Sequence, residues 1–298
     1  MTTLSITPAR TSAALLVLAG ILWGTGGLAG SILSSAAGLH PVSVAAYRLL
    51  VGGVCATTAV AGAGGFRFLR AHPGRLLVTG ALLAEFQAAY QVAVARISVS
   101  LATLITVGCV PVCVAGATAL RERRLPNNRT LAAVAGSLAG LALLTGAPGG
   151  TEGWRTVSGV GMSVLAGAGF AVLTLITARP VTGQDAITSV GLVVGGGCLA
   201  PFALAYGMAV PLTGEVLALV AYLGVVPTAV AYGAYFLGLR HASATAAALA
   251  TMLEPLTATL LAVAFHDERL TAAGVGGAVL IAGALALYYV PSRGGSAR

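Results

Sequence analysis

Long apolar segments follow one another along almost the whole chain, and this feature constrains the fold more than any other. Of the 298 residues, 57% are hydrophobic and only 8% are charged, whereas a soluble domain carries roughly 25% charged residues. A surface that faces water cannot be built from so few charges. Most of the surface must therefore face lipid, where a helix of about 20 mainly apolar residues crosses the hydrocarbon layer.

Apolar runs bounded by Arg, Pro, Gly or acidic residues predict ten membrane-spanning helices joined by short loops. The first run has an apolar part longer than the core of a signal peptide, so we expect it to remain as a span. No polar stretch is long enough for a separate soluble domain. The predicted spans are 12–34, 41–63, 76–96, 98–120, 130–147, 156–178, 186–208, 214–239, 242–265 and 270–290.

The arginines are distributed unequally between the two sides of such a bundle. All 16 basic residues are Arg, and with a cytoplasmic N-terminus twelve lie at inner span ends, three in outer loops and Arg48 within a span. Cytoplasmic loops carry the excess of basic residues in membrane proteins, so we predict a multi-pass protein of the cell (inner) membrane with both termini cytoplasmic. The net charge of +8 is then a topology signal, and no nucleic-acid partner is expected. The inner positions are Arg10, Arg67, Arg70, Arg75, Arg121, Arg123, Arg124, Arg129, Arg179, Arg240, Arg293 and Arg298, and the outer ones are Arg96, Arg155 and Arg269.

The two halves of the sequence resemble each other in the order and spacing of several residues. From Tyr90 to Pro111 there are 21 residues, and from Tyr235 to Pro255 there are 20. Further matched segments are Leu18-Ala19-Gly20 with Leu165-Ala166-Gly167, Trp23-Gly24 with Phe170-Ala171, and Gly140-Leu141-Ala142 with Gly283-Ala284-Leu285.

We therefore predict a first five-helix repeat at 11–147 and a second five-helix repeat at 156–290. Because five is an odd number, the second repeat must be inserted upside down relative to the first. Inverted repeats are a design of membrane transporters, in which the binding site lies near the middle of the membrane between the repeats. Chance similarity between helices rich in Ala, Gly and Leu is the alternative.

Ionisable residues within spans are costly and usually mark function, and Glu254 is the first candidate. It precedes Pro255 in the ninth predicted span, and Thr251 lies on the same helical face. Proline leaves a backbone carbonyl without its donor and kinks a helix. A carboxyl group beside a kink suits the binding of a cation, an ammonium group or a proton. The alternative is a neutral glutamic acid that satisfies the broken helix.

Other polar residues of the spans form additional candidates for substrate binding or coupling. Glu85 lies on one face of the third span, and Gln87, Tyr90 and Gln91 lie on another, so only one of these faces needs to line a cavity. Arg48 either extends to the interface or pairs with a carboxylate across the bundle. The full set of candidates is Glu254, Glu85, Tyr90, Gln87, Gln91, Trp23, Tyr232, Tyr235 and Thr251 for binding or coupling, and Pro111, Pro255 and Arg48 for structure or gating.

Patterns that would indicate catalysis or metal binding do not stand out. We find no phosphate-binding loop with Lys, no pair of His at metal-ligand spacing and no nucleophile beside a usable base. Cys109 and Cys113 lie on one helical face, but no His is near them, and we interpret them as buried apolar residues. We therefore predict that the protein is not an enzyme and has neither a cofactor nor a metal site.

These features, in this order, resemble the EamA-like family of the drug/metabolite transporter superfamily over about 12–290. The chain differs from the family pattern at the end of the fourth span, where the expected acidic-basic pair lies early, at Glu122-Arg123. The motifs of the resemblance are Trp23-Gly24, Pro41 with Arg48, Tyr90 and Pro111 in the first half, and Tyr235, Ser243-Ala244, Glu254-Pro255 and Asp267-Glu268-Arg269-Leu270 in the second.

The resemblance implies a basket of ten helices around a cavity lined mainly by spans one, three, four, six, eight and nine. It also implies export of small metabolites, amino acids or drugs, often in exchange for protons. The expected partners are a small-molecule substrate and membrane lipid, and a role of protons and a homodimer are left open. A membrane scaffold or receptor that transports nothing is the main alternative, and a membrane-embedded enzyme is a second one.

Overall fold

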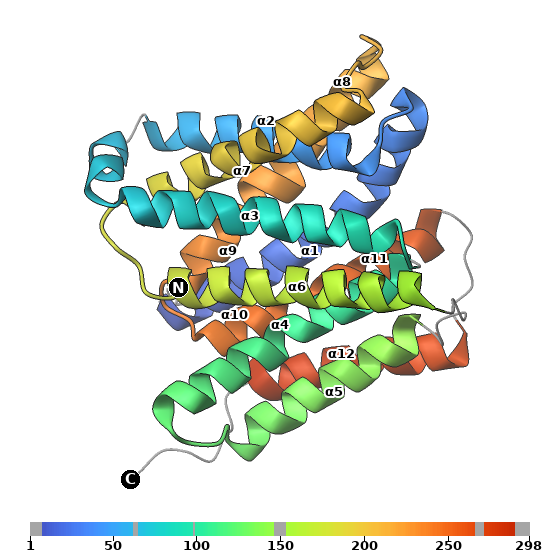
Figure 1. The fold of residues 1–298 in the computed structure, drawn as a ribbon. Helices are drawn as coiled ribbons and strands as arrows, with labels where there is room; N and C mark the ends of the chain where they lie inside the picture. The colour runs from blue at the N-terminus through green and yellow to red at the C-terminus, as the bar shows by residue number, and fades with distance from the viewer. Residues whose placement is uncertain (1–7, 62–64, 98, 146–152, 266–270, 290–298) are drawn as a thin grey trace, which may run out of the picture.

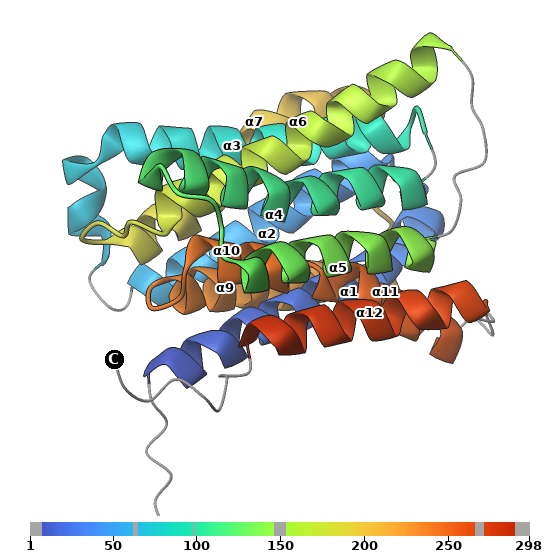
Figure 2. The ribbon, with the colours of Figure 1, turned by 90° about the horizontal axis from the view of Figure 1, so that it is seen from below.

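The computed structural model describes residues 8–61, 65–97, 99–145, 153–265 and 271–289, and in these ranges the chain is helical without strands (Figure 1). The helices run side by side as one bundle (Figures 1 and 2). They are α1 (Pro8–Ala37), α2 (Pro41–Ala61), the 3-10 helix η1 (Gly65–Ala71), α3 (Pro73–Val94), α4 (Val99–Glu122), α5 (Asn128–Thr145), α6 (Trp154–Thr177), α7 (Gln184–Tyr206), α8 (Gly214–Gly224), the π-helix η2 (Val225–Val230), α9 (Ala231–Leu239), α10 (Ala244–Ala250), α11 (Leu253–Phe265) and α12 (Ala272–Tyr289).

Nine helical stretches of the described residues are long and apolar enough to cross a membrane. Two of them are composite, since α8, η2 and α9 form Gly214–Leu239, and α10 and α11 form Ala244–Phe265. The remaining long helix, α5, has 18 residues and begins with the polar pair Asn128-Arg129. It lies along α12 in both views (Figures 1 and 2). With α5 as the tenth span, the predicted all-α membrane fold is confirmed.

The helices pack in pairs that repeat between the two halves. In the second half α6 packs against α3 and α4 of the first half, and in the first half α1 packs against α9 and α11 of the second. The helices α2 and α7 pack against each other, as do α5 and α12. Each contact therefore has a counterpart when the halves exchange places, as two inverted five-helix repeats require.

Close approaches at glycines show the same correspondence at the level of single residues. A Cβ atom on Gly20 of α1 would lie 2.5 Å from the carbonyl oxygen of Ala250. A Cβ atom on Gly167 of α6 would collide with the carbonyl oxygen of Thr106. Ala250 lies five residues before Pro255, and Thr106 lies five residues before Pro111. The two crossings are therefore equivalent, in agreement with the sequence match of Leu18–Gly20 with Leu165–Gly167.

The pair formed by α2 and α7 is reciprocal in the same way. A Cβ on Gly53 would lie 2.6 Å from the backbone nitrogen of Val193, and a Cβ on Gly196 would lie 2.9 Å from that of Leu50. Leu50 precedes Gly53 by three residues, and Val193 precedes Gly196 by three. Small residues allow helices to approach this closely where lipid provides no hydrophobic drive for their association.

The match that the sequence suggested near the ends of the two repeats was wrong. The packing pairs Gly140 with Gly277, because a Cβ on Gly140 would lie 2.7 Å from the Gly277 carbonyl oxygen and a Cβ on Gly277 would meet the Gly140 carbonyl. A Cβ on Gly283, the match expected from sequence, would meet nothing within 4 Å. A helix crossing needs small residues at the point of contact, and Gly283 lies away from that point.

The second repeat contains two interruptions of helix geometry that the first repeat lacks. In the eighth span Pro227 has no N–H for the Leu223 carbonyl, and the hydroxyl of Thr228 donates to this carbonyl instead, at 2.7 Å. The ninth span breaks at Thr251 and Met252, where the Thr251 carbonyl accepts from the N–H of Glu254 at 3.0 Å. The helix interruption expected from Pro255 is therefore present.

Candidate functional site

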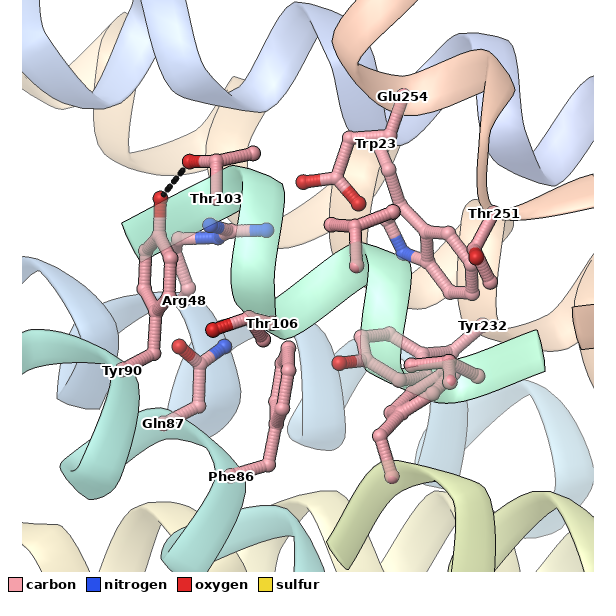
Figure 3. A pocket seen from close by; sticks show the side chains of 13 residues that line it. Trp23, Arg48, Phe86, Gln87, Tyr90, Thr103, Thr106, Tyr232, Thr251 and Glu254 are labelled. Atoms are coloured by element: carbon pink, nitrogen blue, oxygen red, sulfur yellow. Dashed lines mark hydrogen bonds between the residues drawn. The ribbon is translucent and has the colours of Figure 1, made fainter. Parts of the chain in front are cut away.

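A cavity lies between the two repeats near the middle of the bundle (Figure 3). The centre of a water molecule can occupy about 60 Å³ of it, which is enough for several waters. Helices of both repeats contribute to its wall, including α2, which the family resemblance did not imply. The lining residues are Trp23, Arg48, Phe86, Gln87, Tyr90, Thr103, Thr106, Val107, Val110, Phe170, Tyr232, Thr251 and Glu254.

Two side chains of opposite charge reach into this cavity from opposite sides (Figure 3). Arg48 comes from α2 of the first repeat, and Glu254 comes from the first turn of α11 in the second. Both of these residues lie in the described part of the chain, and no ion pair within 4 Å joins them there. They are close enough to interact electrostatically, so the space between them is polar at both ends.

Two hydrogen-bond donors of the lining are buried without a partner. They are the indole Nε1 of Trp23, a residue that is only 6% exposed, and the guanidinium Nε of Arg48. A buried polar group that lacks a partner costs about 1–3 kcal/mol, and native structures contain few such groups. Donors of this kind around a cavity indicate that an acceptor belongs in it.

Aromatic rings form a continuous part of the cavity wall. The ring of Trp23 lies 5.8 Å from Phe170, 5.2 Å from Tyr232 and 5.0 Å from Tyr235, measured between centroids. Tyr235 is fully buried behind the lining, and its hydroxyl is 2.7 Å from the hydroxyl of Thr174. Tyr235, a predicted binding residue, therefore supports the wall and does not line the cavity.

A second hollow lies beside the cavity, toward the span ends predicted to face outward, and the two share Arg48 and Tyr90. The Tyr90 hydroxyl is 2.7 Å from the Thr103 hydroxyl and so links α3 to α4 (Figure 3). Gln91 lines the second hollow and donates to the Pro41 carbonyl at 3.2 Å. The lining of the hollow consists of Gly26, Gly27, Gly30, Ser31, Ser34, Ser35, Pro41, Val44, Ala45, Arg48, Tyr90, Gln91, Val94 and Val99.

Of the two polar faces that the sequence left open on the third span, the one with Gln87 and Tyr90 lines the cavity. Glu85 lies outside the lining, at the contact of α3 with α6. Both of its carboxyl oxygens are buried without a hydrogen-bond partner. The Oε2 atom occupies the space where a side chain on residue 169 would begin, so Gly169 is needed for this arrangement.

The prolines lie near the cavity without lining it, and several lining residues were missed by the sequence analysis. Pro111 is buried within the continuous helix α4, and Pro255 follows the lining residue Glu254. The predicted motif at 267–270 lies outside the described residues.

The missed lining residues are Phe86, Thr103, Thr106, Val107, Val110 and Phe170. Four of these are spaced three or four apart on α4, so helical periodicity could have found them.

Ten helices in two inverted repeats around a central cavity define the class of membrane transport proteins with inverted-topology repeats. The chain belongs to the EamA-like transporter family, whose model matches residues 10–146 and 157–290. The chain is 29% identical over 282 residues to the "Uncharacterized transporter YwfM" of Bacillus subtilis (strain 168), and 93% of each chain is covered. The fold also matches a chain of known crystal structure with a TM-score of 0.79 and 20% identity, covering 93% of this chain and 96% of that one.

The family and the name of the relative identify a membrane transporter and point away from an enzyme. A transporter of this kind has a small-molecule substrate and works in a lipid environment. The central cavity offers room and unpaired polar groups for such a substrate.

Proposed function

We propose that the protein is a secondary transporter that exports a small metabolite, amino acid or drug across the cytoplasmic membrane, in exchange for protons or for another solute. The observation that carries the proposal is the central cavity, which both repeats line and in which Trp23 and Arg48 present unpaired buried donors. We take 11–147 and 156–290 as the two repeats that move against each other, with both termini in the cytoplasm.

Glu254 is the group that we expect to couple transport to protons. It is the acidic residue of the cavity lining, and the charged or titratable groups that share the cavity with it are Arg48, Tyr90 and Tyr232. A carboxylate can bind a proton or a cationic group of the solute, but not both at full strength. Protonation from one side of the membrane would therefore release a solute that entered from the other side, which is the basis of exchange.

The substitution Glu254→Gln tests this role, since it keeps the shape of the side chain and removes its charge. We expect normal folding and membrane insertion but loss of solute-driven proton movement. The assay uses proteoliposomes that contain a pH-sensitive dye, to which amino acids, amines and organic acids are added one at a time. Glu85→Gln is the matched control, because Glu85 is also a carboxyl group within a span but lies outside the cavity lining.

The parent and Glu85→Gln should respond to the same compounds, and Glu254→Gln should respond to none. A Glu254→Gln variant that retains proton movement would show that Glu254 only supports the helix interruption. Loss of the response in Glu85→Gln alone would assign the coupling to Glu85.

A further inference from the structure

When Glu254 is ionised, the charges of the cavity lining sum to zero. Arg48 contributes one positive charge, Glu254 contributes one negative charge, and the other lining side chains are uncharged. An isolated charge within a protein surrounded by lipid costs several kcal/mol. A solute with a net charge would leave either itself or one of these two residues without compensation. The cavity is therefore suited to a solute whose own charges also sum to zero.

The Arg48 side of the cavity has the chemistry to hold a carboxylate. A guanidinium group presents several N–H donors in one plane, which match the two oxygens of a carboxylate. The Nε of Arg48 is buried and has no acceptor. A carboxylate bound at this edge of the guanidinium would satisfy Nε and balance the positive charge at the same time.

The Glu254 side has the chemistry to hold an ammonium group. Glu254 supplies a negative charge, and Thr251 supplies an oxygen. The hydroxyl of Thr251 donates its proton to the Ala248 carbonyl at 2.8 Å, so its lone pairs are left to accept. The rings of Trp23 and Tyr232 also border the cavity, and aromatic faces attract cations.

Apart from these two ends, part of the wall is apolar and bears on the rest of the solute. Phe86, Val107, Val110 and Phe170 form this part, and the uncharged polar residues Gln87, Tyr90, Thr103 and Thr106 complete the lining. Buried apolar contacts favour a small uncharged hydrocarbon group, and a charged group would find no partner among the four apolar residues.

We propose that the cavity selects a zwitterion with no net charge, whose carboxylate binds Arg48 and whose ammonium group binds Glu254, with a small apolar group between them. The proposal deepens the transport function proposed above and gives its substrate a chemical class. A solute of this kind lies antiparallel to the Arg48–Glu254 pair, so that each charge of the site faces an opposite charge of the solute.

Three compounds of similar size and different charge test the proposal on the purified full-length protein in lipid nanodiscs. Leucine is the zwitterion, leucine methyl ester is a cation, and N-acetylleucine is an anion. Binding is measured by titration calorimetry at neutral pH. We expect leucine to bind and each of the two derivatives to bind at least about tenfold more weakly. Equal binding of either derivative, or no binding of leucine, would overturn the proposal.

Two substitutions should change this preference in opposite directions. Arg48→Gln leaves the negative charge of Glu254 unbalanced, so the ester should become the best of the three ligands. Glu254→Gln leaves Arg48 unbalanced, so N-acetylleucine should become the best. Damage to the fold would weaken all three compounds together and could not produce opposite preferences. If both variants bind the three compounds in the same order of affinity as the parent, the two residues do not select the charge of the ligand and the proposal fails.

Arg240→Gln is the control, since it removes an arginine that pairs with Asp185 outside the cavity lining. It should leave the preference for leucine unchanged.

The binding assay does not depend on transport, so the two proposals can fail separately. Leucine binding without solute-driven proton movement would contradict the proton coupling proposed for Glu254 and leave the proposal of a zwitterionic ligand standing. Proton movement driven by the ester and not by leucine would contradict only the proposal that the cavity selects a zwitterion.

Discussion

Two threonines of the ninth span make similar hydrogen bonds but differ in what they face. The hydroxyl of Thr251 donates to the Ala248 carbonyl at 2.8 Å, and that of Thr259 donates to the Pro255 carbonyl at 2.8 Å. Only Thr251 lines the cavity. A comparison of substitutions at these two positions therefore distinguishes a role in ligand binding from a role within the helix.

We predict that Thr251→Val weakens leucine binding by about tenfold, the effect of one hydrogen bond to a charged group. Thr259→Val should leave binding unchanged, because Thr259 is outside the cavity lining. Calorimetric titration of both variants in nanodiscs gives the comparison. Equal losses in the two variants would mean that the hydroxyl acts through the helix and not through the ligand.

At the level of single residues, the sequence identified most of the polar groups of the candidate site, missed Thr103 and Thr106, and did not identify their partners. Glu254, Tyr90 and Trp23 stand out because polar or aromatic groups within spans are few. The sequence left open whether Arg48 pairs with a carboxylate across the bundle. That Glu254 is the carboxyl group that shares its cavity could not be predicted, since this depends on how distant helices pack. Glu85 shows the same limit, because periodicity assigns it to a face of α3 but does not say which neighbour that face meets.

The irregular part of the eighth span depends on the exchange of one hydrogen-bond donor for another. Pro227 removes the backbone donor for the Leu223 carbonyl, and the hydroxyl of Thr228 replaces it at 2.7 Å. Both Pro227 and Thr228 are buried, so water cannot substitute. A buried carbonyl that loses its donor costs about 1–3 kcal/mol.

We predict that Thr228→Val destabilises the protein by about 1–3 kcal/mol in thermal unfolding in detergent. The same substitution should cost less in a Pro227→Ala background, because alanine restores an N–H that can serve the carbonyl. A double-mutant cycle measures this coupling. Additive effects would show that Thr228 does not compensate for Pro227.

At the level of helices, the sequence located the spans well and their internal geometry poorly. Apolar runs bounded by charges and prolines gave the ten spans, because length and hydropathy are properties of the segment itself. The prolines were poorer predictors of helix interruptions, since α4 continues through Pro111. The ninth span breaks before Pro255. Whether a proline only bends a helix or breaks it depends on what the surrounding side chains offer to the freed carbonyl.

For the whole molecule, we expect the distribution of the arginines to set the orientation in the membrane. Two contacts at the end predicted to be cytoplasmic join helices there. Arg75 donates to the Ile176 and Arg179 carbonyls at 2.5 and 2.6 Å, and Arg240 pairs with Asp185.

We predict that a fluorescent reporter that matures only in the cytoplasm, fused after the last residue, gives fluorescent cells. A dark fusion, together with activity of a periplasmic reporter at the same point, would reverse the orientation.

The correspondence between the repeats also predicts a pathway that this structure does not show open. The hollow that adjoins the cavity lies on the side of the first repeat, where Thr103 and Thr106 of α4 line the cavity. Their counterparts, placed by Pro111 and Pro255, are Ala247 and Ala250 of α10, and these are 0% and 1% exposed. The helix α10 is short and is separated from α11 by the break at Thr251 and Met252.

In a transporter with inverted repeats, the inward-open state arises when the repeats exchange conformations. The α10 segment should therefore swing away and open a path to the cytoplasm along Ala247.

We predict that Ala247→Cys is modified by a membrane-impermeant thiol reagent from the cytoplasmic side, and only while solute is being transported. Thr103→Cys should be modified from the outer side in the absence of solute, since Thr103 contacts Tyr90, which borders the outward hollow. Inside-out and right-side-out vesicles present the two sides, and mass spectrometry of the labelled peptide separates residue 247 from the four native cysteines. The proton-movement assay first establishes that each variant is active. An active Ala247→Cys variant that resists the reagent from both sides during transport would show that the inner pathway does not run along α10, and that the exchange of conformations does not extend to this part of the second repeat.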